Sequence, residues 1–190
     1  MSKRIDHREE VYHNTGLHIS SRTIDLSGEI DYALSGQFIR NLHILEHLSN
    51  QAITVKLNTP GGDETQGMAI YDVISLSKCE ITIFGIGDVC SMGSIIFQAG
   101  NHRLLYPNAI LMFHLGDSDD GIRHKKANKN WHEFAEKYDK KLDNILYTRI
   151  LEKHPNFLRR KFVRMNEFDT ILTAKEAVDL GLADGIVKWG

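Results

Sequence analysis

Most of the chain shows the apolar spacing of strands or of helices. Residues 22–26 alternate apolar and polar side chains, and residues 52–57 and 80–86 are rich in β-forming residues, so we predict three strands. Two short strands bracket Pro107. Helices are predicted between the strands, at residues 32–48, around 68–74 and over 91–99. This strand–helix alternation is typical of parallel βαβ units, so we predict the α/β class.

The second half of the chain has longer helical signals. Apolar residues recur at helical spacing over residues 127–151, which predicts a long amphipathic helix. A second helix is predicted over residues 173–180: it begins with a Thr followed by Glu at the third position, and it ends at Gly181. A last short strand is expected at residues 186–187.

Length and composition indicate one globular domain. The 190 residues are 42% apolar, and the two cysteines have no partners at zinc-finger spacing. We expect residues 1–21, which are polar, to form a flexible arm, and residues 22–190 to form the domain. No stretch has the pattern of a membrane span, and the charged N-terminus does not resemble a signal peptide. The expected location is a reducing cytoplasm, with no membrane partner.

Charge and residue spacing give little support for a nucleic-acid-binding protein or a metal-dependent enzyme. The chain carries 23 basic and 25 acidic residues, a net charge of −2, although residues 123–164 alone carry a net +8. A nucleic-acid surface would explain this local excess, but no base-reading motif accompanies it, so a solvated helix face is the preferred interpretation. Residues 43–47 match the His-x-x-Glu-His spacing of some zinc sites without an evident third ligand. We expect no nucleic acid, metal or cofactor.

The candidate chemistry lies at predicted strand ends. Ser91 falls where a buried strand turns into a helix, so free backbone N–H groups would surround it. The turn after the preceding parallel strand, which contains Gly62, can present further donors at the same sheet edge. His114 ends another strand and could act as a general base, and Asp169 could orient its imidazole. Spacing alone does not establish such a triad.

Several motifs together resemble the Clp protease proteolytic subunit family. Residues 58–62 (NTPGG) and 67–72 (GMAIYD) are similar to its N-S-P-G-G and G-x-A-I-Y-D segments. Residues 90–94 (CSMGS) look like its nucleophile motif, and residues 111–114 (LMFH) look like the strand that ends in its catalytic His. Residues 169–177 and 181–184 resemble its catalytic Asp and closing helix. The motifs occur in the family's order.

The resemblance implies a fold, a site and partners. The expected fold is the ClpP/crotonase-type spiral of ββα units, with a protruding handle at about residues 115–160. Ser91 would be the nucleophile, His114 the general base and Asp169 its orienting group. The backbone N–H groups of Gly62 and Met92 would form the oxyanion hole. The family implies a serine endopeptidase in a homo-oligomeric ring, expected to be heptameric and able to stack as a double ring. Its partners would be an AAA+ unfoldase and peptide or unfolded substrates.

Two other functions stay open at this point. A crotonase-type acyl-CoA enzyme could use the same N–H donors without Ser91 or His114, and a catalytically inactive ClpP-like subunit could have a structural role. Cys90 is a rival nucleophile, but we expect it to be a packing residue. We also expect the apolar stripe of the long helix to be covered by a second subunit.

Overall fold

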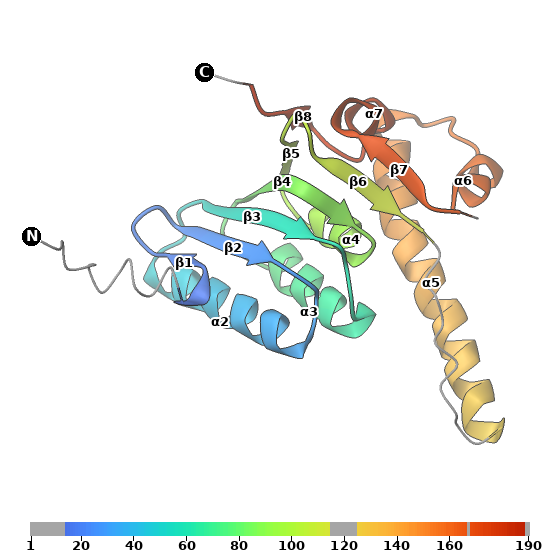
Figure 1. The fold of residues 1–190 in the computed structure, drawn as a ribbon, viewed down its shortest axis with the longest axis horizontal. Helices are drawn as coiled ribbons and strands as arrows, with labels where there is room; N and C mark the ends of the chain where they lie inside the picture. Colours follow the sequence, from blue (N-terminus) through green and yellow to red (C-terminus); the bar gives the residue numbers. More distant parts are fainter. Residues whose placement is uncertain (1–13, 115–124, 167, 189–190) are drawn as a thin grey trace, which may run out of the picture.

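A single sheet of eight strands organises the protein (Figure 1). The computed structural model describes residues 14–114, 125–166 and 168–188. The strands are β1 (Leu17–His18), β2 (Thr23–Ser27), β3 (Ile53–Thr59), β4 (Ile81–Cys90), β5 (His102–Leu105), β6 (Ile110–Phe113), β7 (Thr170–Thr173) and β8 (Gly185–Ile186). Their order in the sheet is β1-β2-β3-β4-β5-β8, with β6 paired to β4 and β7 paired to β6.

The pairing of these strands agrees with the predicted βαβ units. Strands β2 to β5 are parallel neighbours, and β8 adds to β5 in the same direction. β4 is the longest strand, and its register with β3 shifts between Leu57 and Thr59. Its first half pairs with β5, whereas its end, residues 88–90, pairs in parallel with β6. β4 therefore joins the other strands to β6 and β7, which form a branch of the same sheet.

The helices are α2 (Tyr32–Leu48), α3 (Glu64–Ser75), α4 (Met92–Phe97), α5 (Lys125–Lys153), α6 (Arg159–Met165) and α7 (Ala174–Leu180). Helices α2 and α3 lie on one face of the sheet (Figure 1). Asp31 and Asp63 cap them by accepting hydrogen bonds from backbone N–H groups of the first turn. α7 has the predicted capping box between Thr173 and Glu176 and ends at Gly181, whose φ of 93° is left-handed.

Helix α5 crosses the end of the sheet and extends beyond it (Figure 1). Leu146 and Ile150, in its second half, are buried in the core, and Leu142 and Ile145 pack partly against it. Phe134, closer to the start of the helix, is 51% exposed. The expectation that the whole apolar stripe needs a second subunit is therefore wrong for the second half of α5, because the protein's own core covers it.

Three further features differ from the sequence-based expectations. The expected arm over residues 1–21 is too long, because Leu17 is buried and β1 pairs antiparallel with β2. The rest of the expected arm, residues 1–13, lies outside the described part of the chain, as do residues 115–124 of the expected handle. Helix α6 and strand β7 were not predicted. Strand β4 continues beyond the predicted end at residue 86 as far as Cys90, although Gly87 has a φ of 63°. Among the described helices, none is long and apolar enough to cross a membrane.

Candidate active site

Strand register brings three predicted site residues to one place. Cys90 at the end of β4 is opposite Met112 in parallel β6, so the chain just beyond these strands places Ser91 near His114. On the other side of β6, its last residue is opposite Thr170 in antiparallel β7. The residue preceding Thr170 is Asp169, which therefore lies beside His114. Two adjacent strand pairings thus bring together residues that lie as far as 78 positions apart in the sequence, from 91 to 169.

Ser91 has a strained backbone at the turn from β4 to α4. Its φ is 51° and its ψ is −121°, a conformation that costs a non-glycine residue of order 1–3 kcal/mol. Hydrogen bonds hold the turn in place: the Ser91 N–H donates to the Met112 carbonyl at 2.8 Å, and the Ser94 hydroxyl donates to the Ser91 carbonyl at 2.7 Å. The side chain is consequently presented at the end of the strand without capping α4.

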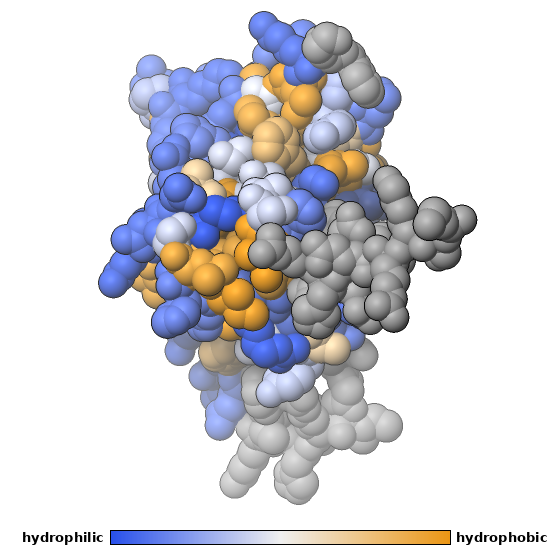
Figure 2. Space-filling view, turned by 90° about the vertical axis from the view of Figure 1, so that its left-hand side faces the viewer, coloured by the Kyte–Doolittle hydropathy of each residue, from blue (hydrophilic) through white to orange (hydrophobic). Residues whose placement is uncertain are grey.

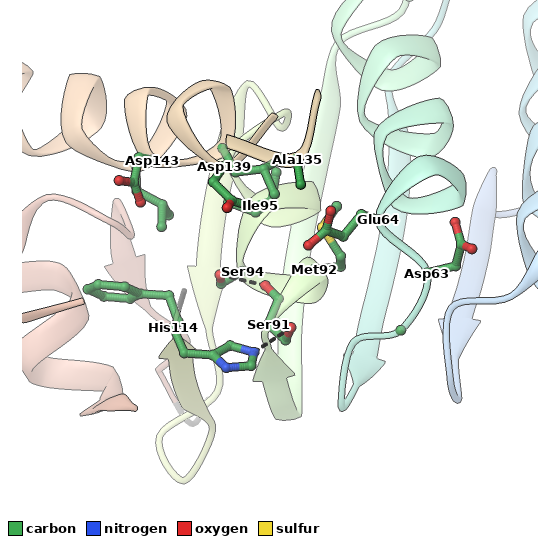
Figure 3. A pocket seen from close by; sticks show the side chains of 14 residues that line it. Asp63, Glu64, Ser91, Met92, Ser94, Ile95, His114, Ala135, Asp139 and Asp143 are labelled. Carbon is green, nitrogen blue, oxygen red and sulfur yellow. Dashed lines mark hydrogen bonds between the residues drawn. The ribbon is translucent and has the colours of Figure 1, made fainter. Parts of the chain in front are cut away.

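Ser91 and His114 are in direct contact (Figure 3). The Ser91 Oγ lies 2.9 Å from His114 Nε2, within hydrogen-bond distance. On the other side of the ring, His114 Nδ1 lies 3.6 Å from an Asp169 carboxylate oxygen. This separation is longer than a hydrogen bond but within the range of an ion pair. The Asp169 side chain is 61% exposed, whereas that of His114 is 26% exposed.

The glycine turn between β3 and α3 lies directly against Ser91. A Cβ on Gly61, whose φ is 105°, would come within 2.6 Å of the Ser91 Cβ and 3.1 Å of the Met92 nitrogen. The bridge to Ile30 uses the Gly61 carbonyl and the Asp63 N–H, so the Gly62 N–H takes no part in it. Met92 begins α4, where helix N–H groups have no acceptor within the helix. The two predicted oxyanion-hole residues are therefore close to the serine.

A cavity of about 550 Å³ opens beside Ser91 and His114 (Figure 3). The start of α3, the start of α4, the end of β6 and one side of α5 form its walls. Four carboxylates line it, and the sequence analysis assigned them no role: Asp63, Glu64, Asp139 and Asp143. A signal was present in the sequence, because Asp139 and Asp143 are spaced four apart on the same stripe of the long helix as Ala135, Leu142 and Leu146.

Cys90 is buried and does not line this cavity. It is 7% exposed, and burial raises the pKa of its thiol, so little thiolate forms at neutral pH. Among the residues with described positions, no three His, Cys, Asp or Glu side chains are grouped to hold a metal ion. In the sequence motif at residues 43–47, the Glu46 carboxylate instead accepts a hydrogen bond from the Ser77 hydroxyl at 2.6 Å.

The chain is similar to known proteins over most of its length. It matches the Clp protease family over residues 6–189. It is 31% identical over 173 residues to "ATP-dependent Clp protease proteolytic subunit 2" of Treponema denticola, a match that covers 90% of this chain and 84% of that protein. It is 28% identical over 172 residues to "ATP-dependent Clp protease proteolytic subunit" of Deinococcus radiodurans, covering 89% of this chain and 81% of that protein.

A solved structure has a similar fold. A mutant of ClpP1 from Listeria monocytogenes superposes with a TM-score of 0.78 at 25% sequence identity, covering 90% of this chain and 94% of that one. The family resemblance and the fold class predicted from the sequence are both confirmed. The curated relatives are named as proteolytic subunits, which favours neither an acyl-CoA enzyme nor a purely structural protein. The chain belongs to the Clp protease family.

Proposed function

We propose that this protein is a serine endopeptidase in which Ser91 is the nucleophile, His114 the general base and Asp169 its orienting group. The observation that carries the proposal is the 2.9 Å contact between Ser91 Oγ and His114 Nε2, at a strained turn beside an open cavity. Serine is a weak nucleophile until an adjacent base removes its proton, and this contact gives the hydroxyl such a base. Membership of the Clp protease family supports the same chemistry.

The first half-reaction forms an acyl-enzyme. The Ser91 Oγ attacks the scissile carbonyl carbon while its proton moves to His114 Nε2. The carbonyl π electrons move to the oxygen, and the backbone N–H groups of Gly62 and Met92 donate hydrogen bonds to the resulting oxyanion. Collapse of this intermediate breaks the C–N bond, and His114 gives its proton to the leaving amine. Asp169 holds the imidazole with Nδ1 protonated and stabilises its charged form.

The second half-reaction uses water as the nucleophile. His114 accepts a proton from the water as its oxygen attacks the acyl carbon, and the same N–H groups hold the second oxyanion. When the C–O bond to Ser91 breaks, His114 returns the proton to Oγ. The net reaction consumes one water and leaves a carboxylic acid and an amine. The side chains named here supply all of the proton transfers.

We further propose that the peptidase works as a homo-oligomeric ring, heptameric by analogy with the family, with an AAA+ unfoldase that supplies unfolded chains. Curated relatives carry the words "ATP-dependent" in their names. Apolar patches lie among polar side chains on the face near α2 and β1 (Figure 2), and α2 carries Ile44 and Leu48, which are 44% and 56% exposed. A ring contact would cover such residues. Both cysteines are free, which fits the predicted cytoplasmic location.

Hydrolysis of short peptides tests the proposal. The wild-type chain should cleave fluorogenic peptide amides, and Ser91→Ala should lower kcat by roughly three orders of magnitude or more, because members of a triad act as a unit. Ser77→Ala, which replaces a serine outside the cavity, is the control and should keep the wild-type rate. Equal rates for Ser91→Ala and the wild type would refute the assignment.

A further inference from the structure

The cavity beside Ser91 is lined by several acidic side chains. Its polar side chains, apart from the serines and His114, are all carboxylates, and they come from α3 with its cap and from α5. In Figure 3, Glu64 from α3 is drawn next to Met92, and Asp139 from α5 is drawn next to Ile95. The cavity is adjacent to the nucleophile, so a substrate side chain next to the cleaved bond would enter it.

Two of the four carboxylates already have partners in the protein. Asp63 accepts a hydrogen bond from the Gln66 N–H at 2.8 Å as the cap of α3. Asp143 lies 3.5 Å from the Arg159 guanidinium and accepts a hydrogen bond from the Asn166 amide. The fold therefore holds both side chains in place, but only Asp143 lies next to a positive charge, because the partner of Asp63 is a neutral N–H group.

Glu64 and Asp139 lack a lysine or arginine partner among the side chains that the structure describes. Burial, followed by the nearby charge of Asp139, raises the pKa of Glu64, and His114 opposes this only weakly. Burial raises the pKa of Asp139 as well. Both shifts have one physical meaning: each carboxylate has lost water without gaining a positive charge that compensates for it. A cation placed between them would offset the free-energy cost of this lost hydration through its attraction to both carboxylates.

Apart from the carboxylates, the serines and His114, the side chains of the cavity wall are apolar. Met92, Ile95, Leu142 and Leu146 line it together with the ring of Phe113. A pocket with apolar walls and carboxylates matches a side chain with an aliphatic stem and a cationic head, because the stem packs on apolar surface while the head meets the charges. Lysine and arginine are the two amino acids with this form. A purely apolar side chain would fill the walls but leave both carboxylates desolvated and unpaired.

We propose that Glu64 and Asp139 make this peptidase selective for substrates with lysine or arginine immediately before the cleaved bond. The inference rests on the proposed function, since it takes Ser91 as the nucleophile. Arginine can also contact two carboxylates at once through its planar guanidinium, which suits charges arriving from two different helices. Charge-assisted hydrogen bonds typically contribute enough to change kcat/KM by about 10- to 100-fold.

A pair of matched peptides tests this selectivity. Two fluorogenic tripeptide amides would differ only before the cleaved bond, with arginine in one and citrulline, its uncharged isostere, in the other. The measured quantity is the ratio of their kcat/KM values, which cancels any difference in the fraction of active enzyme. The variants are Glu64→Gln, Asp139→Asn and their combination. Glu133→Gln is the control, because it removes an exposed charge from the same helix outside the cavity.

We expect the wild type and Glu133→Gln to prefer arginine over citrulline by about 10- to 100-fold. Each cavity variant should lower this ratio, and the double variant should bring it close to one. A wild-type ratio near one, or a high ratio that the double variant keeps, would overturn the inference while leaving the peptidase intact. Failure of the wild type to cleave either peptide would overturn the proposed function and, with it, the selectivity.

Discussion

Replacing Gly61 by alanine tests whether the glycine turn positions Ser91. We expect this variant to lose more activity than its loss of stability explains. Gly61 has a φ of 105°, and an added Cβ would lie 2.6 Å from the Ser91 Cβ and 3.0 Å from the Cys90 carbonyl. The neighbours that must move are backbone and a Cβ rather than the end of a flexible side chain. We expect the turn carrying Ser91 and the Met92 N–H to shift away from the glycine loop.

Gly28 offers a matched control. Its φ of 111° is close to that of Gly61, but an added Cβ would meet no atom within 4 Å. Both substitutions impose the backbone strain of a side chain at positive φ, roughly 1–3 kcal/mol. Only Gly61→Ala adds the cost of overpacking, typically about another 1–3 kcal/mol. The difference between the two variants therefore measures the collision with the Ser91 turn.

The expected effects on activity differ more strongly. Loss of one oxyanion-hole donor typically costs about 100- to 1,000-fold in kcat, so Gly61→Ala should lose at least about 100-fold. Gly28→Ala should stay within about twofold of the wild type under conditions where it is folded. Urea unfolding gives the stabilities, and peptide hydrolysis per folded chain gives kcat. Equal kcat values for the two variants would show that the Gly61 loop does not position the nucleophile.

Three further results are expected. Cys90→Ala should keep peptidase activity within about threefold, since Cys90 is a buried packing residue; an inactive variant alongside an active Ser91→Ala would identify a thiol peptidase. Arg103→Gln should lower the free energy of unfolding by about 2–3 kcal/mol at pH 7, because Arg103 donates to the Asp184 carboxylate. Although burial acts against it, hydrogen bonding to Arg103 lowers the pKa of Asp184 below its unfolded value. The stability difference between wild type and Arg103→Gln should therefore be complete above about pH 4 and shrink as the pH falls through the folded pKa; a difference unchanged in acid would contradict this.

Local patterns in the sequence predicted the main elements well. The helix at residues 32–48 and the capping box of α7 agree with the structure because these signals depend on side chains within a few residues of one another. Strand β7 was missed because it pairs with β6 across a long stretch of sequence, Ile110 with Thr173 for example, and because Ile171 is exposed. Helix α6 was missed because it is short, and Phe162 is its one buried side chain among the described residues.

The residues of the candidate site also differ in whether a local sequence pattern could predict them. Ser91, His114 and Asp169 could be named because each lies in a short segment that resembles a family motif, and the strand register then brings them together. The acidic cavity could not be found in that way. Glu64 and Asp139 are 75 residues apart and meet only because α5 packs across the start of α3, where the Tyr138 hydroxyl donates to the Glu64 carbonyl at 3.3 Å.

Covalent labelling by a fluorophosphonate, followed by mass spectrometry of the adduct, tests the central claim most directly. The reagent is attacked by an activated serine, so we predict one adduct per chain, on the Ser91 Oγ. Ser91→Ala should abolish the adduct, and His114→Ala should slow its formation by roughly 100-fold or more, because the serine then lacks its base. An adduct on another residue, or equal labelling of wild type and Ser91→Ala, would contradict the assignment of Ser91 as the nucleophile.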